Sequence, residues 1–206
     1  MPIVPGDPGE SSPWAGRRVP PGQRVRAEAP IMHYGPVPKP ARRPWTFTVG
    51  GATRSGRERV LGLDEVLALP ALERVADMHC ATHWTVLDQH WSGVSAAAMV
   101  ALAPAAEGVT SALVFAEFGY AANVPLEELA SGEAILATHL DGVPLSLERG
   151  APLRLVIPQL YTWKGPKWLR GWNYLRPGDP DLGFWEDHGY HRHGGVWREE
   201  RYDYQR

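Results

Sequence analysis

The only cysteine of the chain, Cys80, is the residue with the widest range of possible chemistry. It lies in the segment from Ala76 to Trp84, where an apolar run gives way to polar residues that include His79 and His83. A thiolate at the end of a strand can bind a soft metal or act as a nucleophile. A single cysteine is also often an inert apolar residue in a core. The neighbouring motifs must therefore decide between these functions.

A second candidate group lies near the C-terminus, where His188, His191 and His193 occur close together. Imidazole is a common zinc ligand, so these residues could support a zinc-dependent hydrolase. One loop rarely supplies a closed tetrahedral site, however, and no cysteine lies nearby. We favour imidazoles that present their edges to a pocket or to solvent. His191 is then a candidate substrate-pocket residue, together with His79 and His83.

A basic stretch forms a candidate anion site. Lys164, Gly165, Pro166 and Lys167 are consecutive, and Arg154 lies upstream of them. A glycine lets backbone amides approach a phosphate closely, while lysine and arginine supply charge and donors. Tryptophans at positions 163, 168 and 172 flank the stretch, and this mixture suits a planar heterocycle that carries a phosphate. Alone, the same stretch is compatible with a solvated surface patch.

The elements that must position these residues are short strands with few helices. Apolar patterns predict strands over residues 45–49, 72–78, 84–87, 111–118, 135–140, 143–147 and 153–157. Asp141-Gly142 predicts a tight hairpin turn between two of them. Short helices are expected over residues 63–69 and, after an N-cap at Ser95, over residues 96–102. The pattern predicts a mixed α+β domain that is richer in strand than in helix.

The N-terminal part of the chain differs from the rest. Eleven of the twenty prolines fall within residues 1–44. Because proline fixes φ and lacks an amide donor, this segment cannot form regular helix or a central strand. We expect residues 1–44 to form an extended arm with a disordered first part, and residues 45–206 to form one domain.

Composition excludes several classes of protein. A net charge of −2 argues against a nucleic-acid-binding protein, which usually carries a basic face. No window approaches the roughly twenty apolar residues of a membrane span, so no membrane insertion is expected. The single cysteine rules out an intrachain disulfide, and the N-terminus has no apolar run of secretory length. These features favour a cytoplasmic location.

Several motifs in order resemble those of the sulfite oxidase family. The segments that carry the resemblance are residues 79–84 (HCATHW), 91–94 (WSGV), 150–158 (GAPLRLVIP), 164–168 (KGPKW), 183–186 (GFWE), 189–191 (GYH) and 197–202 (WREERY). The first two are similar to the metal-cysteine motif of the family, in which the second segment opens a helix. In the arm, residues 21–23 and 33–35 fit the same group, so the likeness runs from about residue 20 to residue 204.

The resemblance implies a molybdopterin-dependent oxidoreductase that transfers an oxygen atom, with two electrons, to or from a small oxyanion or sulfoxide-type substrate. It implies the sulfite oxidase molybdopterin-binding fold, with mixed and mostly antiparallel sheets, and a separate electron-transfer protein as partner. Cys80 would be the metal ligand and a catalytic residue, together with His83. The cofactor-binding residues that it implies are His33, Tyr34, Cys80, Arg154, Lys164, Gly165, Pro166 and Lys167.

The chain also departs from part of the family. Animal and plant sulfite oxidases carry an arginine-rich pocket beside the metal, whereas Ala81, Thr82 and His83 follow the cysteine here. Sulfite is therefore doubtful as the substrate, and the chain looks more like the catalytic subunit of bacterial methionine sulfoxide reductases. The alternatives are the zinc-dependent hydrolase and a non-catalytic scaffold that retains the fold.

Overall fold

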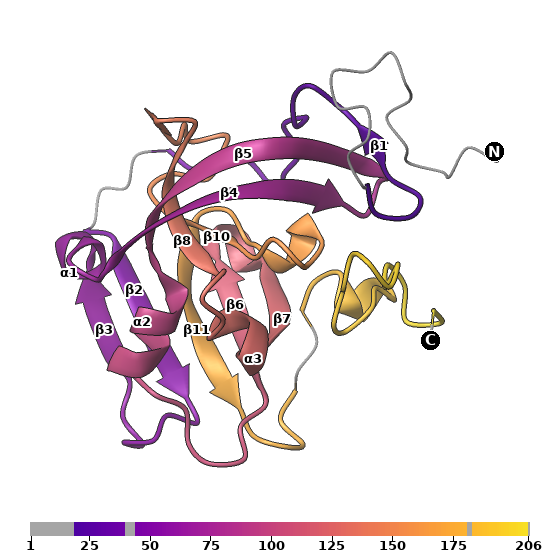
Figure 1. Ribbon diagram of the computed structural model, residues 1–206. Helices are drawn as coiled ribbons and strands as arrows, with labels where there is room; N and C mark the ends of the chain where they lie inside the picture. Colours follow the sequence, from indigo (N-terminus) through magenta and orange to yellow (C-terminus); the bar gives the residue numbers. More distant parts are fainter. Residues whose placement is uncertain (1–18, 40–43, 181–182, 206) are drawn as a thin grey trace.

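The computed structural model describes residues 19–39, 44–180 and 183–205, and its strands form two sheets (Figure 1). The six-stranded sheet has the order β1-β5-β8-β10, with β4 paired to β5 and β9 paired to β8. Its strands are β1 (Arg24–Val25), β4 (Ala71–Cys80), β5 (Trp84–Ser95), β8 (Ile135–Leu140), β9 (Val143–Pro144) and β10 (Arg154–Val156).

The second sheet has five strands in the order β3-β2-β11-β6-β7. They are β2 (Thr46–Gly51), β3 (Arg59–Gly62), β6 (Ser111–Ala116), β7 (Ala121–Pro125) and β11 (Leu169–Leu175). The pairs β1–β5 and β2–β11 are parallel, and the other strand pairs are antiparallel. The predicted mixed and mostly antiparallel α+β fold is therefore confirmed.

Helices are short and lie at the ends of strands. The α-helices are α1 (Leu63–Leu67), α2 (Ala96–Leu102) and α3 (Leu126–Leu129), and 3-10 helices span Glu117–Gly119, Thr162–Lys164 and Glu186–His188. Within the described residues, no helix is both long and apolar enough to cross a membrane.

The long hairpin of β4 and β5 arches over the five-stranded sheet (Figure 1). Two apolar clusters account for this arrangement. The larger lies between the sheets, where the ring of Phe47 meets Trp172 edge-on with centroids 5.1 Å apart. The second lies beneath the hairpin and includes Met78, Trp84 and Trp91. The free energy gained by burying apolar groups is roughly proportional to the surface area that is removed from water. These large rings therefore stabilise the packing of the hairpin against the body.

Strand β5 is longer than the sequence predicts. Residues 91–94, expected to open a helix, complete this strand instead, and Gly93 pairs with β8. A Cβ at Gly93 would lie 2.1 Å from the carbonyl oxygen of Leu136, so only glycine allows the two strands to approach so closely. Helix α2 begins after Ser95, as predicted, because the Ser95 hydroxyl accepts a hydrogen bond from the amide of Ala98 at 3.2 Å.

The arm and the C-terminal segment both lie against this body. The expected disorder of the first part of the arm concerns residues 1–18, which lie outside the described residues. Farther along, the amide of Arg26 donates to the carbonyl of Thr85 at 2.8 Å, beside the β1–β5 pair. The C-terminal segment, yellow in Figure 1, lies beside β7, where the amide of Phe184 donates to Ala121.

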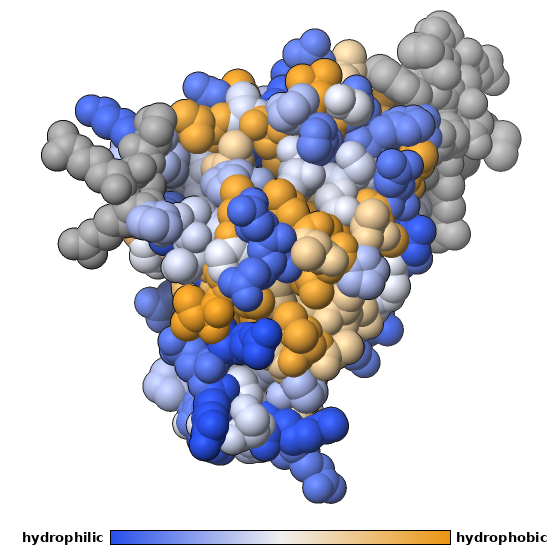
Figure 2. Space-filling model, turned by 90° about the vertical axis from the view of Figure 1, so that its left-hand side faces the viewer, coloured by the Kyte–Doolittle hydropathy of each residue, from blue (hydrophilic) through white to orange (hydrophobic). Residues whose placement is uncertain are grey.

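Figure 2 shows the side of the molecule that is on the left in Figure 1. Apolar side chains on this face lie scattered among charged ones. The elements on that side, β3, α1 and α2, carry the exposed residues Val60, Leu67 and Leu102.

Candidate active site

The turn between β4 and β5 carries the cysteine. The two strands pair up to the last residue, where Cys80 lies opposite Trp84. His83 adopts a left-handed conformation, with φ of 67°, and its amide donates to the carbonyl of Cys80 at 3.1 Å. The side-chain amide of Gln23, from the arm, donates to the same carbonyl at 3.1 Å. The backbone that presents the thiol is therefore held both from within the turn and from the arm.

The thiol of Cys80 lines a cavity of about 400 Å³. Thr82, one turn position beyond Ala81, also lines it and donates a hydrogen bond from its hydroxyl to the Cys80 sulfur at 3.2 Å. A volume of this size is typical of a site for a small molecule or cofactor. The cysteine therefore lies where a bound group can reach it.

Three cations line the same cavity: Arg149, Arg154 and Lys167. Each donates to backbone carbonyls: Arg149 to Ala29 at 3.2 Å, Arg154 to Arg149 at 3.2 Å, and Lys167 to Met32 at 2.8 Å. Within the described ranges, none of the three forms an ion pair with a carboxylate. Arg154 is buried, and Arg149 and Lys167 are half-buried. Three cations gathered in this way make the cavity positive, which favours an anion.

Burial and mutual repulsion lower the pKa values of Lys167 and Arg154. Burial, followed by repulsion from Arg154 and Arg149, lowers the pKa of Lys167 to about 8. Burial, and then Arg149, lowers the pKa of Arg154 to about 10. An anion bound here would raise the pKa values of both Lys167 and Arg154, because an opposite charge favours the protonated form.

Unpartnered donors show that the cavity fits the pterin and its phosphate. The Nε of Arg154 and the indole nitrogens of Trp84 and Trp163 are buried and find no hydrogen-bond partner among the residues that the structure describes. All three side chains line the cavity. Because buried donors are normally satisfied, these three favour a ligand that is rich in acceptors, as phosphate and pterin are. Arg154 also lies over the ring of Trp91, with its Cζ 5.3 Å from the ring centroid.

The loop that follows the Thr162–Lys164 helix forms one wall of the cavity. Gly165, Pro166 and Lys167 all line it, as the sequence predicts for a cofactor-binding loop. A Cβ at Gly165 would lie 2.4 Å from the carbonyl oxygen of Leu155. Glycine thus allows the loop to pack directly against β10, next to Arg154.

The arm also lines the cavity. His33 and Tyr34, both predicted to bind the cofactor, are among its lining residues. The ring of His33 is 5.4 Å from that of Trp168, and the ring of Tyr34 is 4.3 Å from that of Phe184. The hydrogen bond from Lys167 to the carbonyl of Met32 holds this part of the arm in place.

Two of the predicted site residues require correction. Lys164 does not line the cavity; it is fully buried, and its ammonium forms an ion pair with Glu186 at 2.6 Å. His83 is exposed and also lies outside the cavity, because its left-handed turn directs Nδ1 to the carbonyl of Gly22 at 2.8 Å. Neither residue is placed to contact a cofactor or a substrate in the cavity.

The other histidines proposed for a substrate pocket also lie elsewhere. His79 is buried, and its Nδ1 is 2.8 Å from the hydroxyl of Thr85; burial lowers its pKa to about 4, so it is neutral at pH 7. His191 accepts hydrogen bonds on Nδ1 from the amides of His193 and Gly194, at 3.1 and 3.3 Å. These contacts give both imidazoles structural roles.

The C-terminal histidines form no zinc site with the other residues that the structure describes. The two ring nitrogens of His193 face the carboxylates of Glu200 and Glu128, the latter at 3.3 Å, and Nδ1 of His188 faces the carbonyl of Phe184 at 2.6 Å. Among the residues that the structure describes, no three His, Cys, Asp or Glu side chains are grouped to hold a metal ion. The arrangement of the described histidines therefore gives the zinc-dependent hydrolase no support.

Arg149, Tyr120, Trp185 and Tyr190 are among the lining residues that sequence reasoning missed. The hydroxyl of Tyr120 donates to the carbonyl of Trp163 at 2.6 Å, and burial raises its pKa well above the usual value. Tyr190 and Trp185 pack on the apolar cluster that contains Ala81 and Trp163. The aromatic residues near 185–190 were visible in the sequence, but nothing local showed that they fold back to the cysteine.

Comparison with known proteins places this site in a family. The family model described as the oxidoreductase molybdopterin binding domain matches residues 34–182. The chain is 38% identical to an uncharacterized oxidoreductase, YuiH, of Bacillus subtilis, over 90% of this chain and 92% of that protein. It is 28% identical to the protein-methionine-sulfoxide reductase catalytic subunit MsrP of Gluconobacter oxydans, over 65% of this chain and 51% of that protein. The chain thus spans about half the length of this second relative.

A solved structure supports the same fold. The sulfane dehydrogenase SoxCD of Paracoccus pantotrophus superposes with a TM-score of 0.63, at 17% sequence identity, over 76% of this chain and 43% of that chain. Cys80, the cationic wall formed by Arg149, Arg154 and Lys167, and the unpartnered donors all agree with the family assignment. The chain therefore belongs to the family of oxidoreductases with a molybdopterin binding domain, and it is an enzyme of the sulfite oxidase type whose cofactor is molybdopterin.

Proposed function

We propose that the enzyme reduces a small uncharged sulfoxide-type substrate and receives its electrons from a separate electron-transfer protein. One observation carries this proposal. Among the described residues, the cations that line the cavity contact segments other than the turn of Cys80: Arg154 lies over the ring of Trp91 in β5, and Lys167 donates to the carbonyls of Met32 and Glu148. They therefore suit the phosphate of the cofactor rather than a substrate at the thiol.

The wall near Cys80 is aromatic. Trp163, Trp185 and Tyr190 line the cavity, and all three pack with Ala81, the residue after the cysteine. The ring of Tyr190 meets Trp163 edge-on, with centroids 5.0 Å apart. An anion moved from water to such a wall loses its hydration without gaining a counter-charge. An uncharged sulfoxide with apolar substituents is therefore a better match than sulfite.

The chemistry divides between the cofactor and the chain. When bound, the molybdenum group would supply a two-electron couple for oxygen-atom transfer. Reduction of a sulfoxide consumes two electrons and two protons and yields one thioether and one water. Among the described residues, no hydrogen bond forms at the Tyr190 hydroxyl, so it can donate one to the sulfoxide oxygen. Burial raises the pKa of Tyr190, which keeps this donor protonated at pH 7.

The similarity to the methionine-sulfoxide reductase subunit supports the same substrate class. The test is steady-state turnover of the purified holoenzyme. With reduced viologen as electron donor, we expect turnover of dimethyl sulfoxide and methionine sulfoxide. With ferricyanide as acceptor, we expect little oxidation of sulfite. Oxidation of sulfite without reduction of any sulfoxide would contradict the proposal.

A matched pair of variants tests the aromatic wall. Tyr190→Phe should raise the KM for a sulfoxide several-fold, because it removes the hydrogen-bond donor and keeps the ring. Tyr202→Phe is the control, since Tyr202 packs on the ring of Tyr190 but does not line the cavity. Equal kinetic constants for the two variants would argue against a role of the Tyr190 hydroxyl.

A further inference from the structure

The ammonium of Lys164 lies at the centre of a buried network. It donates to Glu186 Oε1 at 2.6 Å, to the carbonyl of Asn123 at 2.7 Å and to the carbonyl of Arg192. The same carboxylate oxygen of Glu186 accepts a hydrogen bond from the amide of Asn123 at 3.0 Å. Both charged side chains are completely excluded from solvent, with 0% of each exposed.

The two partners stand next to two different walls of the cavity. Lys164 ends the Thr162–Lys164 helix, directly before the loop that contains Gly165 and Lys167. Glu186 begins the Glu186–His188 helix, directly after Trp185. The ion pair therefore connects the cofactor-binding loop to the C-terminal segment that supplies the aromatic wall.

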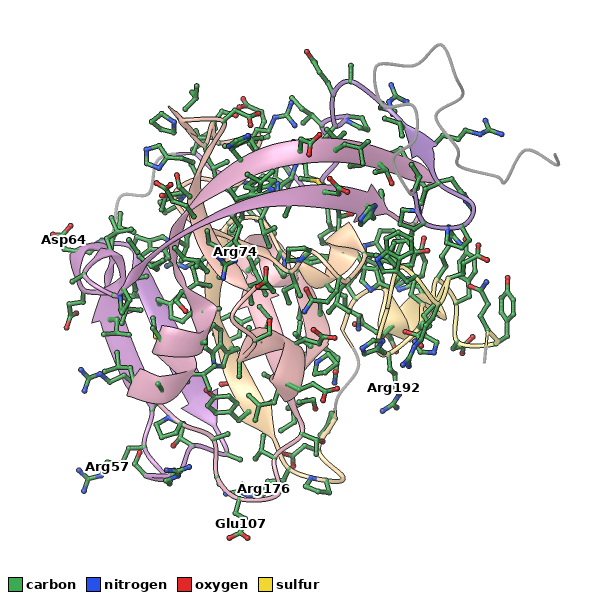
Figure 3. The ribbon with its side chains drawn as sticks, in the orientation of Figure 1. Arg57, Asp64, Arg74, Glu107, Arg176 and Arg192 are labelled. Atoms are coloured by element: carbon green, nitrogen blue, oxygen red, sulfur yellow. The ribbon has the colours of Figure 1, made fainter. Side chains whose placement is uncertain are left out.

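Close packing around the pair shows that this connection is built into the fold. A Cβ at Gly194 would lie 3.0 Å from Cε of Lys164, so the returning chain passes directly over the lysine stem. A Cβ at Gly183 would lie 2.5 Å from Glu186 Oε2 and 2.4 Å from Cα of Ala122. In Figure 3 the side chain of Arg192 points away from the body, while its carbonyl accepts the bond from Lys164.

Burial makes this network conditional on the position of the C-terminal segment. A buried ammonium is stable only when it is paired and hydrogen-bonded. Two of the three acceptors of Lys164, Glu186 and Arg192, belong to the C-terminal segment. Displacement of that segment would leave the cation without these partners, so the pair strongly favours one docked position.

We propose that Lys164 and Glu186 are positioning residues that hold Trp185 and Tyr190 opposite Cys80 and so determine the shape of the substrate end of the cavity. The part of this inference that assigns Trp185 and Tyr190 to the substrate rests on the proposed function. It assigns Lys164 to the geometry of the substrate pocket and leaves the phosphate of the cofactor to Arg149, Arg154 and Lys167.

The test compares three single variants: Lys164→Met, Glu186→Gln and, as a matched control, Lys167→Met. For each, molybdenum and pterin content, KM and kcat for a sulfoxide, and hydrogen exchange over residues 183–195 are measured. Lys164→Met and Glu186→Gln should keep the cofactor, raise KM by about tenfold or more, and increase exchange in this segment. Lys167→Met should lose cofactor and leave the exchange unchanged.

The double variant Lys164→Met/Glu186→Gln buries no unpaired charge, and it keeps the test valid where a single variant fails to fold. Hydrogen exchange over residues 183–195 should increase no more in the double variant than in the more disruptive single variant. Each single substitution already removes the interaction between Lys164 and Glu186. Loss of cofactor in Lys164→Met but not in Glu186→Gln would overturn the proposal and make Lys164 a phosphate ligand. Unchanged exchange in both variants would overturn it too. Cofactor content and hydrogen exchange do not require turnover. They therefore test the role of Lys164 and Glu186 even where the enzyme reduces no sulfoxide.

Discussion

The hydroxyl of Thr82 donates a hydrogen bond to the sulfur of Cys80 at 3.2 Å. Both residues line the cavity, and the carbonyl of Cys80 is fixed by the amide of His83 and the side chain of Gln23. These contacts fix the position of the Cys80 thiol, and Thr82 of the same turn supplies a hydrogen-bond donor to its sulfur. A donor to a metal-bound thiolate withdraws electron density from the sulfur and so tunes the metal.

Removal of this donor should lower the midpoint potential of the molybdenum centre. Thr82→Val keeps the shape of the side chain and removes its hydrogen bond to Cys80. A hydrogen bond contributes about 1 kcal/mol, which for a two-electron couple corresponds to a shift of about 20 mV. Redox titration measures the shift. Thr162→Val is the control, because Thr162 lines the cavity without a bond to the cysteine; an equal shift in both variants would count against the role of Thr82.

Substitution of the cysteine should separate cofactor binding from turnover. Cys80→Ser is expected to keep the fold and most of the pterin, because Arg149, Arg154, Lys167 and the arm would hold the cofactor independently of the thiol. Turnover should fall by a factor of about 10³ or more, which corresponds to roughly 4 kcal/mol of transition-state stabilisation. Pterin fluorescence after release and steady-state assays measure the two effects. Normal turnover in Cys80→Ser would instead support the non-catalytic scaffold.

Retention of the cofactor should weaken at alkaline pH. The pKa of Lys167 is lowered to about 8, so in the free protein the ammonium is charged below pH 8 and neutral above it. Because the charged form attracts phosphate, affinity should be highest below pH 8 and fall as pH rises through 8 to 9. Bound phosphate raises the pKa, so the loss begins at higher pH in the holoenzyme.

Dialysis of the holoenzyme at a series of pH values, with pterin content as the readout, measures this effect. Lys167→Arg is the control, since arginine keeps its charge throughout this range. Lys167→Glu should reduce cofactor occupancy at every pH, because it reverses the charge. Identical retention curves for the wild type and Lys167→Arg would show that titration of Lys167 has no part in binding.

Packing of the cofactor loop gives a test of stability. Gly165→Ala would place a Cβ 2.4 Å from the carbonyl oxygen of Leu155 and should destabilise the fold by about 1–3 kcal/mol. It should also reduce cofactor retention, because it displaces the loop that carries Lys167. At Gly132 a Cβ would meet no heavy atom within 4 Å, so Gly132→Ala should change stability by less than about 0.5 kcal/mol. Equal melting temperatures for the two variants would refute this account.

Much of the fold could be predicted because its signals are local. The N-cap at Ser95 and the strand signals around Cys80 were correct, and Asp141-Gly142 forms the expected turn, with φ of 53° and 76°. Strands β1, β3, β7 and β11 were missed. In β11 the sequence LRGWNYL carries a charged residue and a glycine, and its burial depends on neighbours β2 and β6, which are far away in the sequence.

The candidate site was predictable where one motif supplies it and not where two distant segments meet. Cys80, Arg154 and Lys167 belong to ordered motifs, and the structure brings them to one cavity. Lys164 appeared equivalent to Lys167 in the sequence, but its partner Glu186 lies in another segment and draws it into the core. Periodicity cannot show such a pairing, because it depends on the docked position of the C-terminal segment.

The most direct test of the central claim is X-ray absorption at the molybdenum edge, comparing the wild type with Cys80→Ser at equal molybdenum content. The dithiolene of the pterin contributes two sulfur ligands, and the account predicts one additional sulfur in the wild type that is absent from Cys80→Ser. The same number of sulfur ligands in both proteins would contradict the assignment of Cys80 as the metal ligand.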